Sequence, residues 1–464
     1  MVKMITMVIR GVLTDWSRAT GLGIALVLMA VTVLSGCDNI SSPPESTPEE
    51  TPINFEAAYA QADAHARDVP GNFIGSTTAL AEKLFVTLAR EEKETNLFIS
   101  PLSVSIAMGM MMNGASDQNL VEMQEVLELA GFDIPAINQS FENLILSLET
   151  ADKQMDLSIA NSLWLRDSFA PIVKESFTDS LSQHFDAEVH TRDFDDVTAK
   201  DDINAWVGDK TAGRIPVVLN EPIPSDAQMY LINALYFNAE WSKAFDTGLT
   251  RDRDFSRNDG TTVSVPMMRH KDLGVFYTYE WDDDAAEMLW SAVRLPYGRK
   301  AFALYAIMSE DGDNDALLDT IEEKGLGYYF HDWNFNSWQH DTAEIRLPRF
   351  STEYSSDLVE AFETLGMSRA FSLIPGERPF LGIEDQTPQN IMISRILHKA
   401  NIEVDEVGTE AAAVTVIEGL DGSAPPQEDE FVFNANRPFI YLIMDERNNT
   451  ILFMGRMEDP TEVL

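Results

Sequence analysis

Residues 231–245 read LINALYFNAEWSKAF, an apolar β-type segment that runs into a tryptophan. The predicted strand covers residues 229–238 and so begins two residues before this stretch. Further segments of this kind lie at residues 301–308, 439–444 and 451–457. Helical stretches such as residues 357–365 interrupt them. This mixed order, with long apolar strands, predicts an α+β fold around one large core.

The region upstream of these strands has helical signals. Residues 76–91 place four leucine and phenylalanine side chains at helical spacing. Ser100 followed by Pro101 is the pattern of a helix N-cap with proline in the first turn. Between residues 72 and 460 there is no linker rich in proline, glycine or serine, and no internal repeat. We therefore expect a single domain over residues 72–464.

The composition excludes several functions. The chain has 464 residues, of which 45% are apolar, so it can bury a large core. It carries 33 Lys and Arg against 76 Asp and Glu, a net charge of −43. A surface of this charge repels phosphate backbones, and no basic stripe is present, so we expect neither a nucleic-acid partner nor a heparin-like activator. The single cysteine, Cys37, excludes an intrachain disulfide and a thiolate metal cluster.

The N-terminus has the pattern of an export signal. Three cations and one acidic residue in the first 20 residues precede the uncharged run 21–36, which is short for a membrane span. Leu34-Ser35-Gly36-Cys37 resembles the lipobox of bacterial lipoproteins. The resemblance implies that residues 1–36 are removed and that Cys37 receives lipid. An ordinary signal peptide with an accidental cysteine is the alternative.

Residues 37–71 are predicted to be an acidic, proline-rich tether. Residues 38–70 contain five prolines and seven acidic residues with one arginine, and they offer little apolar surface to bury. Lipid on Cys37 would hold the protein to a bilayer without a spanning helix. We therefore expect an exported protein anchored to the bacterial cell envelope, on its periplasmic or cell-surface face.

Eight motifs between residues 72 and 460 resemble those of the serpin (serine protease inhibitor) family, in the family's order. They are residues 96–103 with 114–115, 203–215, 231–245, 265–268, 347–350, 398–400, 408–413, and 436–439 with 453–456. The resemblance implies one serpin domain with three β-sheets, eight or nine helices and an exposed reactive-centre loop over about residues 408–431. It also implies a monomeric inhibitor that is not an enzyme and needs no cofactor or metal.

Residues 408–421 suit both a loop and a strand. Every second residue from Thr409 to Gly419 is small or apolar, while Glu410 and Glu418 belong to the alternate set of residues. Side chains alternate between the faces of a strand, so one face could lie on a core. On this pattern alone an ordinary core strand or hairpin arm remains open. The family resemblance makes the segment a protease bait, whose hinge comprises Gly408, Thr409, Glu410, Ala411, Ala412 and Ala413.

The resemblance implies suicide inhibition: a serine protease cuts the loop, and the cut strand inserts into the central sheet. Counting from the hinge places the cut bond at Gly422-Ser423, with neighbouring positions such as Leu420 and Asp421 also open. The bait from 408 to 430 has no Lys or Arg and six acidic residues, which argues against a trypsin-like target. Small and apolar side chains favour elastase-like or subtilisin-like proteases, with cysteine proteases as a second class.

Two further groups of residues match the family. Ser100, Ser103, Asn233 and His398 match a polar cluster beneath the central sheet that controls its opening, although helix capping or an isolated histidine would explain single members. Trp241, Arg349 and Glu406 match positions where the hinge joins the sheet. An exposed Arg349–Glu406 pair there would contribute only ~0–1 kcal/mol.

The sequence also departs from the family. Asp117 and Asn119 stand where glycine and threonine are usual, Val407 stands where a polar residue is usual, and residues 379–383 form a loose version of their motif.

Two other functions have weaker support. A non-inhibitory serpin acting as a binding module is the main alternative, and the alanine-rich hinge argues against it. A hydrolase would need a catalytic motif, and none is present. Acidic residues 311–322 resemble a calcium loop but lack its central glycine, so we expect no metal site.

Overall fold

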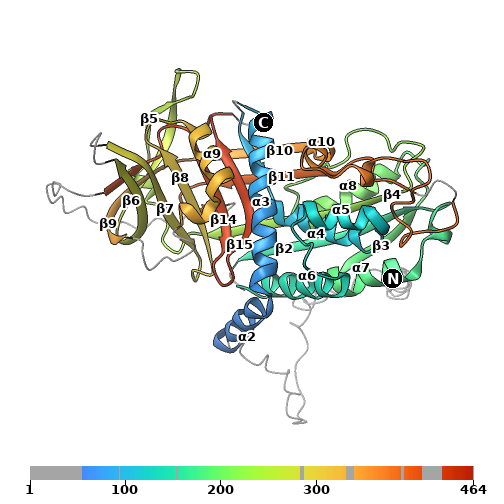
Figure 1. Ribbon diagram of the computed structural model, residues 1–464. Coiled ribbons are helices and arrows are strands. Elements are labelled where there is room, and N and C mark those ends of the chain that lie inside the picture. Colours follow the sequence, from blue (N-terminus) through green and yellow to red (C-terminus); the bar gives the residue numbers. More distant parts are fainter. Residues whose placement is uncertain are drawn as a thin grey trace, which may run out of the picture. The chain divides into compact units, whose positions relative to one another are not determined.

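The computed structural model describes residues 55–93, 95–152, 155–282, 287–330, 339–387, 391–409 and 431–462, all within the compact unit Asn54–Leu464 (Figure 1). These residues form nine α-helices: α2 (Phe55–Asp68), α3 (Gly71–Glu91), α4 (Pro101–Met112), α5 (Asp117–Val126), α6 (Ile134–Glu149), α7 (Glu175–Phe185), α8 (Ala199–Lys210), α9 (Asn314–Lys324) and α10 (Val359–Thr364). None of these helices is long and apolar enough to cross a membrane.

A six-stranded sheet has the order β10-β11-β12-β4-β2-β3. Its strands are β2 (Asp156–Arg166), β3 (Ala187–Arg192), β4 (Met229–Glu240), β10 (Phe350–Asp357), β11 (Leu397–Val404) and the two-residue β12 (Gly408–Thr409). β12 is antiparallel to both of its neighbours. In the described sheet, β4 and β11 are therefore joined only through β12, at one end.

The other strands form a hydrogen-bonded network in the order β1-β15-β14-β8-β7-β6-β9-β13, with β5 paired to β6. They are β1 (Leu97–Ile99), β5 (Arg251–Ser256), β6 (Thr262–Asp282), β7 (Glu287–Tyr297), β8 (Phe302–Ser309), β9 (Gln339–Pro348), β13 (Phe431–Asn434), β14 (Phe439–Asp445) and β15 (Thr450–Met457). The long strand β6 pairs with β5 in its first part and with β7 in its last part, so it belongs to two sheets. The fold therefore has three sheets with α+β organisation, as predicted.

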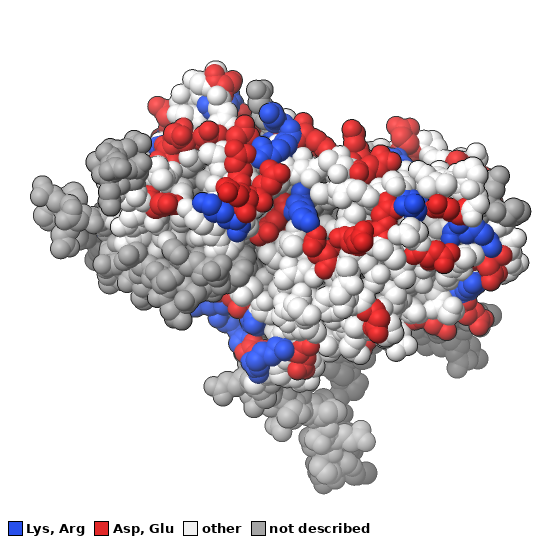
Figure 2. All heavy atoms as spheres, in the orientation of Figure 1, with Lys and Arg blue, Asp and Glu red and all other residues white. Residues whose placement is uncertain are grey.

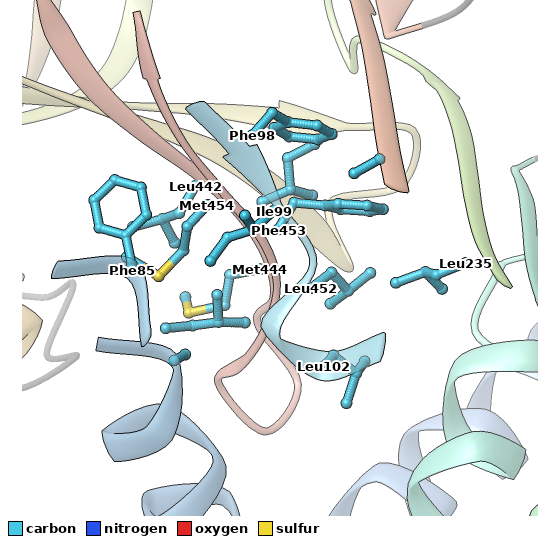
Figure 3. Close-up of a cluster of buried hydrophobic side chains, with 14 of the residues drawn as sticks. Phe85, Phe98, Ile99, Leu102, Leu235, Leu442, Met444, Leu452, Phe453 and Met454 are labelled. Carbon is cyan, nitrogen blue, oxygen red and sulfur yellow. The ribbon is translucent and has the colours of Figure 1, made fainter. Parts of the chain in front are cut away.

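The core lies where the two networks and the first helices meet (Figure 3). Phe85 of α3, Leu102 of α4, Leu235 of β4 and Leu452 of β15 belong to one buried cluster. Each such side chain contributes roughly 1.5–3 kcal/mol through removal from water. Their convergence couples the six-stranded sheet to the rest of the molecule.

Part of the segment predicted to be a tether is helical, so the prediction is wrong for these residues. Residues 55–68 form α2, although the sequence predicts a tether through residue 71. Ala62 and Ala66 are buried, and their spacing of four residues puts them on one helix face. Val69, directly after the helix, is also buried. Small side chains bring this helix close to the neighbouring α6, so burial occurs despite the low apolar content of the segment.

Arg299, in the turn between β7 and β8, fastens α2 to this body. Its guanidinium lies 3.5 Å from the ring centroid of Tyr59. It also donates to Asp63 Oδ1 at 3.2 Å and to the carbonyl of Ala151 at 3.3 Å. One side chain therefore holds α2 to two other parts of the fold.

Candidate functional site

The hinge residues Gly408 and Thr409 lie inside the six-stranded sheet. Gly408 pairs with Glu240 and Thr409 with Ala239 of β4, while Thr409 also pairs with Val404 of β11. A Cβ atom on Gly408 would lie 2.1 Å from the carbonyl oxygen of Ala239, so only glycine fits there.

This placement corrects the predicted limits of the loop. The sequence predicts an exposed, unpaired segment over about residues 408–431, but β12 is paired and Phe431 begins β13. The remaining hinge residues, Glu410, Ala411, Ala412 and Ala413, lie outside the described residues, as do Gly422, Ser423 and Cys37.

Aromatic packing supports this end of the sheet. The ring of Trp241 stacks on the ring of Tyr297 with centroids 4.4 Å apart and planes 12° apart. The indole N–H of Trp241 donates to the carbonyl of Asp405 at 2.9 Å. The Tyr297 hydroxyl lies 2.6 Å from Thr409 Oγ1 in the buried interior. Burial raises the pKa of Tyr297, so its hydroxyl stays protonated.

Arg349 and Glu406 form a two-pronged ion pair at the base of the hinge. Arg349 donates through Nε at 2.6 Å and through Nη2 at 2.7 Å to the two carboxylate oxygens of Glu406. Thr250 Oγ1 donates to the same carboxylate. Burial would raise the pKa of Glu406, but these hydrogen bonds outweigh burial and hold the pKa below its ordinary value.

The burial of this pair is asymmetric, which corrects the expectation of an exposed pair. The side chain of Glu406 is 3% exposed and that of Arg349 is 45% exposed. Loss of Arg349 would leave a charged carboxylate buried beside the hinge. Removal of Arg349 should therefore cost more than the ~0–1 kcal/mol lost from a pair with two exposed partners.

The structure brings Ser100, Ser103, Asn233 and His398 together in a chain of polar contacts. The backbone N–H of Ser100 donates to His398 Nε2 at 3.1 Å, and Ser100 Oγ accepts from the backbone N–H of Ser103 at 3.1 Å. Ser103 Oγ donates to Asn233 Oδ1. The chain links β11, the start of α4 and β4, the two sides of the sheet on either side of β12.

His398 is held as a neutral side chain in this chain of contacts. Burial lowers its pKa to about 4. Its Nε2 accepts a hydrogen bond from Ser100, which a protonated ring could not do. The chain of contacts between β11, α4 and β4 therefore requires a neutral His398.

Asn161 of β2 is a member that sequence analysis missed. Its Oδ1 accepts from Asn233 Nδ2 at 2.6 Å, and its Nδ2 donates to the carbonyl of Phe185 at 2.6 Å. The polar contacts thus extend across β4 to β2 and the end of α7. The available signal is a carboxamide in the otherwise apolar segment around Ile159 and Leu163.

Among the described residues there is no group of three or more His, Cys, Asp or Glu side chains placed to hold a metal ion. Asp313, from the segment that resembles a calcium loop, accepts hydrogen bonds from the backbone N–H groups of Asp315 and Ala316 and caps α9. Helix capping accounts for this carboxylate.

The comparisons with known proteins agree with this architecture. Residues 75–460 match the family described as serpin (serine protease inhibitor). Leukocyte elastase inhibitor of Bos taurus is 30% identical over 393 residues, covering 83% of this chain and 98% of that protein.

Two solved structures share the fold. The thermophilic serpin tengpin, in its native state, has a TM-score of 0.72 at 28% identity, covering 84% of this chain and 95% of its own. Human thyroxine-binding globulin, complexed with thyroxine, has a TM-score of 0.71 at 26% identity, covering 84% of this chain and 99% of its own. The chain belongs to the serpin family, many of whose members are protease inhibitors rather than enzymes.

Proposed function

We propose that this serpin inhibits serine proteases by suicide cleavage of the loop that follows Thr409. The observation that carries the proposal is the position of β12 between β4 and β11. Two hinge residues already pair as a middle strand, antiparallel to both neighbours. A cut loop could continue this strand without changing its direction.

The orientation of Thr409 supports the same proposal. Its side chain is buried and faces Tyr297, so alternate positions after it would face the core. Those positions are Ala411, Ala413, Thr415 and Ile417, none of them charged. If about fourteen residues each add a strand hydrogen bond worth ~0.5–1.5 kcal/mol, insertion releases on the order of 10 kcal/mol. That equals the stability of an ordinary domain, ~5–15 kcal/mol.

The bait composition defines the target class that we propose. We place the cut at Gly422-Ser423 and expect elastase-like or subtilisin-like proteases, with cysteine proteases as a second class. The absence of Lys and Arg from 408–430 removes the cation that a trypsin-like pocket binds. The name of the bovine relative, leukocyte elastase inhibitor, agrees with a target of this kind.

Capture of a protease tests this function directly. The chain is incubated with elastase and with subtilisin, and the products are separated on a denaturing gel. We expect a covalent band at the summed mass, because the acyl-enzyme is trapped when the strand inserts. Cleavage without such a band would support the second candidate, a non-inhibitory binding module, the role suggested by the thyroxine complex of a structural relative.

We also propose that Cys37 carries lipid and anchors the protein to a bacterial cell envelope. The lipobox-like Leu34–Cys37 and the uncharged run before it support this location. Metabolic labelling with a fatty-acid analogue tests it, with Cys37→Ser as the control. We expect label on the wild-type chain and none on the variant; equal labelling of both would overturn the proposal.

A further inference from the structure

Strand β5 lies between the two ends of the loop. Just before β5, Thr250 donates to Glu406, which precedes the hinge. At its other end, the backbone N–H of Ser256 donates at 2.8 Å to the carbonyl of Asn436, which follows β13. Six strand residues span roughly 20 Å. The start and the end of the loop are therefore fixed at opposite ends of β5.

A polar cleft of about 400 Å³ opens beside this strand. It is lined by two cations, two carboxylates and two carboxamides: Arg253, Arg346, Asp252, Asp254, Asn434 and Asn436. Within the described part of the chain, no side chain pairs with the exposed Arg253, and Asn434 Oδ1 has no hydrogen-bond partner. The cleft thus offers unused hydrogen-bonding groups between the described residues that precede and follow the loop.

One wall of the cleft is held in place by Glu344. This buried carboxylate accepts from Arg346 Nε at 2.6 Å and from Arg269 Nη2 at 2.8 Å. Burial would raise the pKa of Glu344, but the two guanidinium groups hold it below its ordinary value. Arg346 is therefore presented in a fixed orientation, with its other nitrogens free of Glu344.

The cleft differs in charge from the rest of the protein. Its two arginines balance its two aspartates, whereas the whole chain carries −43. Acidic side chains cover more of the face in Figure 2 than basic ones do. An acidic partner surface is repelled by the net charge of the chain but meets balanced charges at this cleft.

We propose that the cleft is a docking site for the body of the target protease, whose surface carboxylate binds Arg253 and Arg346 while its active site holds the bait. This inference rests on the proposed inhibitory function. A protease domain of ~250 residues has a diameter of ~45 Å, from its expected radius of gyration. It is wider than β5 is long, so a protease that contacts the described residues at both ends of the loop is large enough to reach the cleft. Guanidinium groups bind carboxylates through two parallel hydrogen bonds.

The test compares association rates of charge variants of the full chain with whichever of elastase or subtilisin it captures. For Arg253→Glu we expect the second-order rate constant to fall about tenfold, with a changed salt dependence, because charges at an interface rim act mainly on association. The fraction of cleaved inhibitor molecules that end as covalent complex stays unchanged, because strand insertion does not involve Arg253. The matched control is Arg251→Glu, an equal charge change on β5 outside the cleft, and we expect its rate to stay within about twofold of wild type.

The contrary outcomes are distinct. If the wild-type chain forms no covalent complex, the inhibitory function fails. If it does, and Arg253→Glu associates as fast as Arg251→Glu or faster, only the docking site fails. A third variant replaces the acidic residues Glu428, Asp429 and Glu430 by the corresponding amides, glutamine and asparagine. A slowing equal to that of Arg253→Glu, with no further slowing when both are combined, would show that the cleft binds its own chain and would overturn the proposal.

Discussion

The hydroxyl groups of Thr409 and Tyr297 lie 2.6 Å apart in the protein interior. Thr409 is 2% exposed, although it is the last described residue before the loop. Thr409 is the first hinge residue whose side chain faces the core, and it lies between β4 and β11. The kind of side chain at position 409 therefore decides whether the residues after it can insert as a strand.

Thr409→Arg should convert the inhibitor into a substrate. A guanidinium cannot occupy the buried space beside Tyr297 without losing its hydration, a cost of several kcal/mol. We expect normal cleavage by the protease and loss of the covalent complex on a denaturing gel. Thr409→Ser keeps the hydroxyl and should keep the complex. Retained trapping by the arginine variant would mean that Thr409 does not lead the insertion.

Arg349→Ala should destabilise the intact protein by about 1–3 kcal/mol, because it leaves the carboxylate of Glu406 buried without its cation. The matched control is Arg395→Ala. The side chain of Arg395 is 46% exposed and that of Arg349 is 45% exposed, but the partner of Arg395, Asp357, is 34% exposed. We expect a loss below about 1 kcal/mol for the control. Chemical denaturation of the two variants measures the difference, and equal losses would contradict the role of burial.

His398 should make the intact form sensitive to mild acid. Its pKa is about 4 in the fold, against an ordinary value of 6.5. The stability that it contributes is complete above pH 6.5 and is lost as the pH falls toward 4, because the unfolded chain takes up the proton first. Between pH 6.5 and 5 the loss is about 2 kcal/mol.

The variant His398→Gln removes this titration, and we expect its stability to fall about 2 kcal/mol less over the same interval. The matched control is His65→Gln, which removes a histidine of α2 outside this chain of contacts. Denaturation curves at several pH values provide the measurement. Parallel pH dependence of wild type and His398→Gln would count against a neutral, buried His398.

Arg299→Ala should loosen α2 from the body. The variant loses the contact with the Tyr59 ring and the ion pair with Asp63, together worth roughly 1–2 kcal/mol. We expect faster limited proteolysis within residues 55–70 and a lower melting temperature. Lys300→Ala, at the exposed neighbouring position, is the control and should change neither. An unchanged proteolysis rate in Arg299→Ala would show that α2 is held by its alanine face alone.

Much of the fold follows from local patterns in the sequence. Ser100 caps α4 through a hydrogen bond from Ser103, as the Ser-Pro pattern predicts. The four segments predicted as strands correspond to β4, β8, β14 and β15. β8, β14 and β15 are buried along their whole length and β4 along half of its length, so their apolar residues identify them without knowledge of distant contacts.

Other features depend on partners far away in the sequence. The buried Glu406 is bonded by Arg349 and Thr250, which lie 57 and 156 residues away in the sequence, and no local pattern reveals these partners. α2 is contacted by Arg299, which lies 236 residues after Asp63 in the chain. Asp117 stands where the family usually has glycine, and its φ of +49° explains that preference, although the sequence alone shows only the departure.

The length of β4 limits where a productive cut can fall. Gly408 pairs with Glu240, and β4 extends back to Met229, a span of twelve residues. In an unchanged antiparallel register, the twelfth residue of the new strand would be Gly419. A bond broken before that residue would leave the far end of β4 without a neighbour, whereas every bond from 420 to 424 supplies enough chain. The fold sets the minimum length of the severed arm, and the pocket of the attacking protease chooses only among the few peptide bonds beyond it.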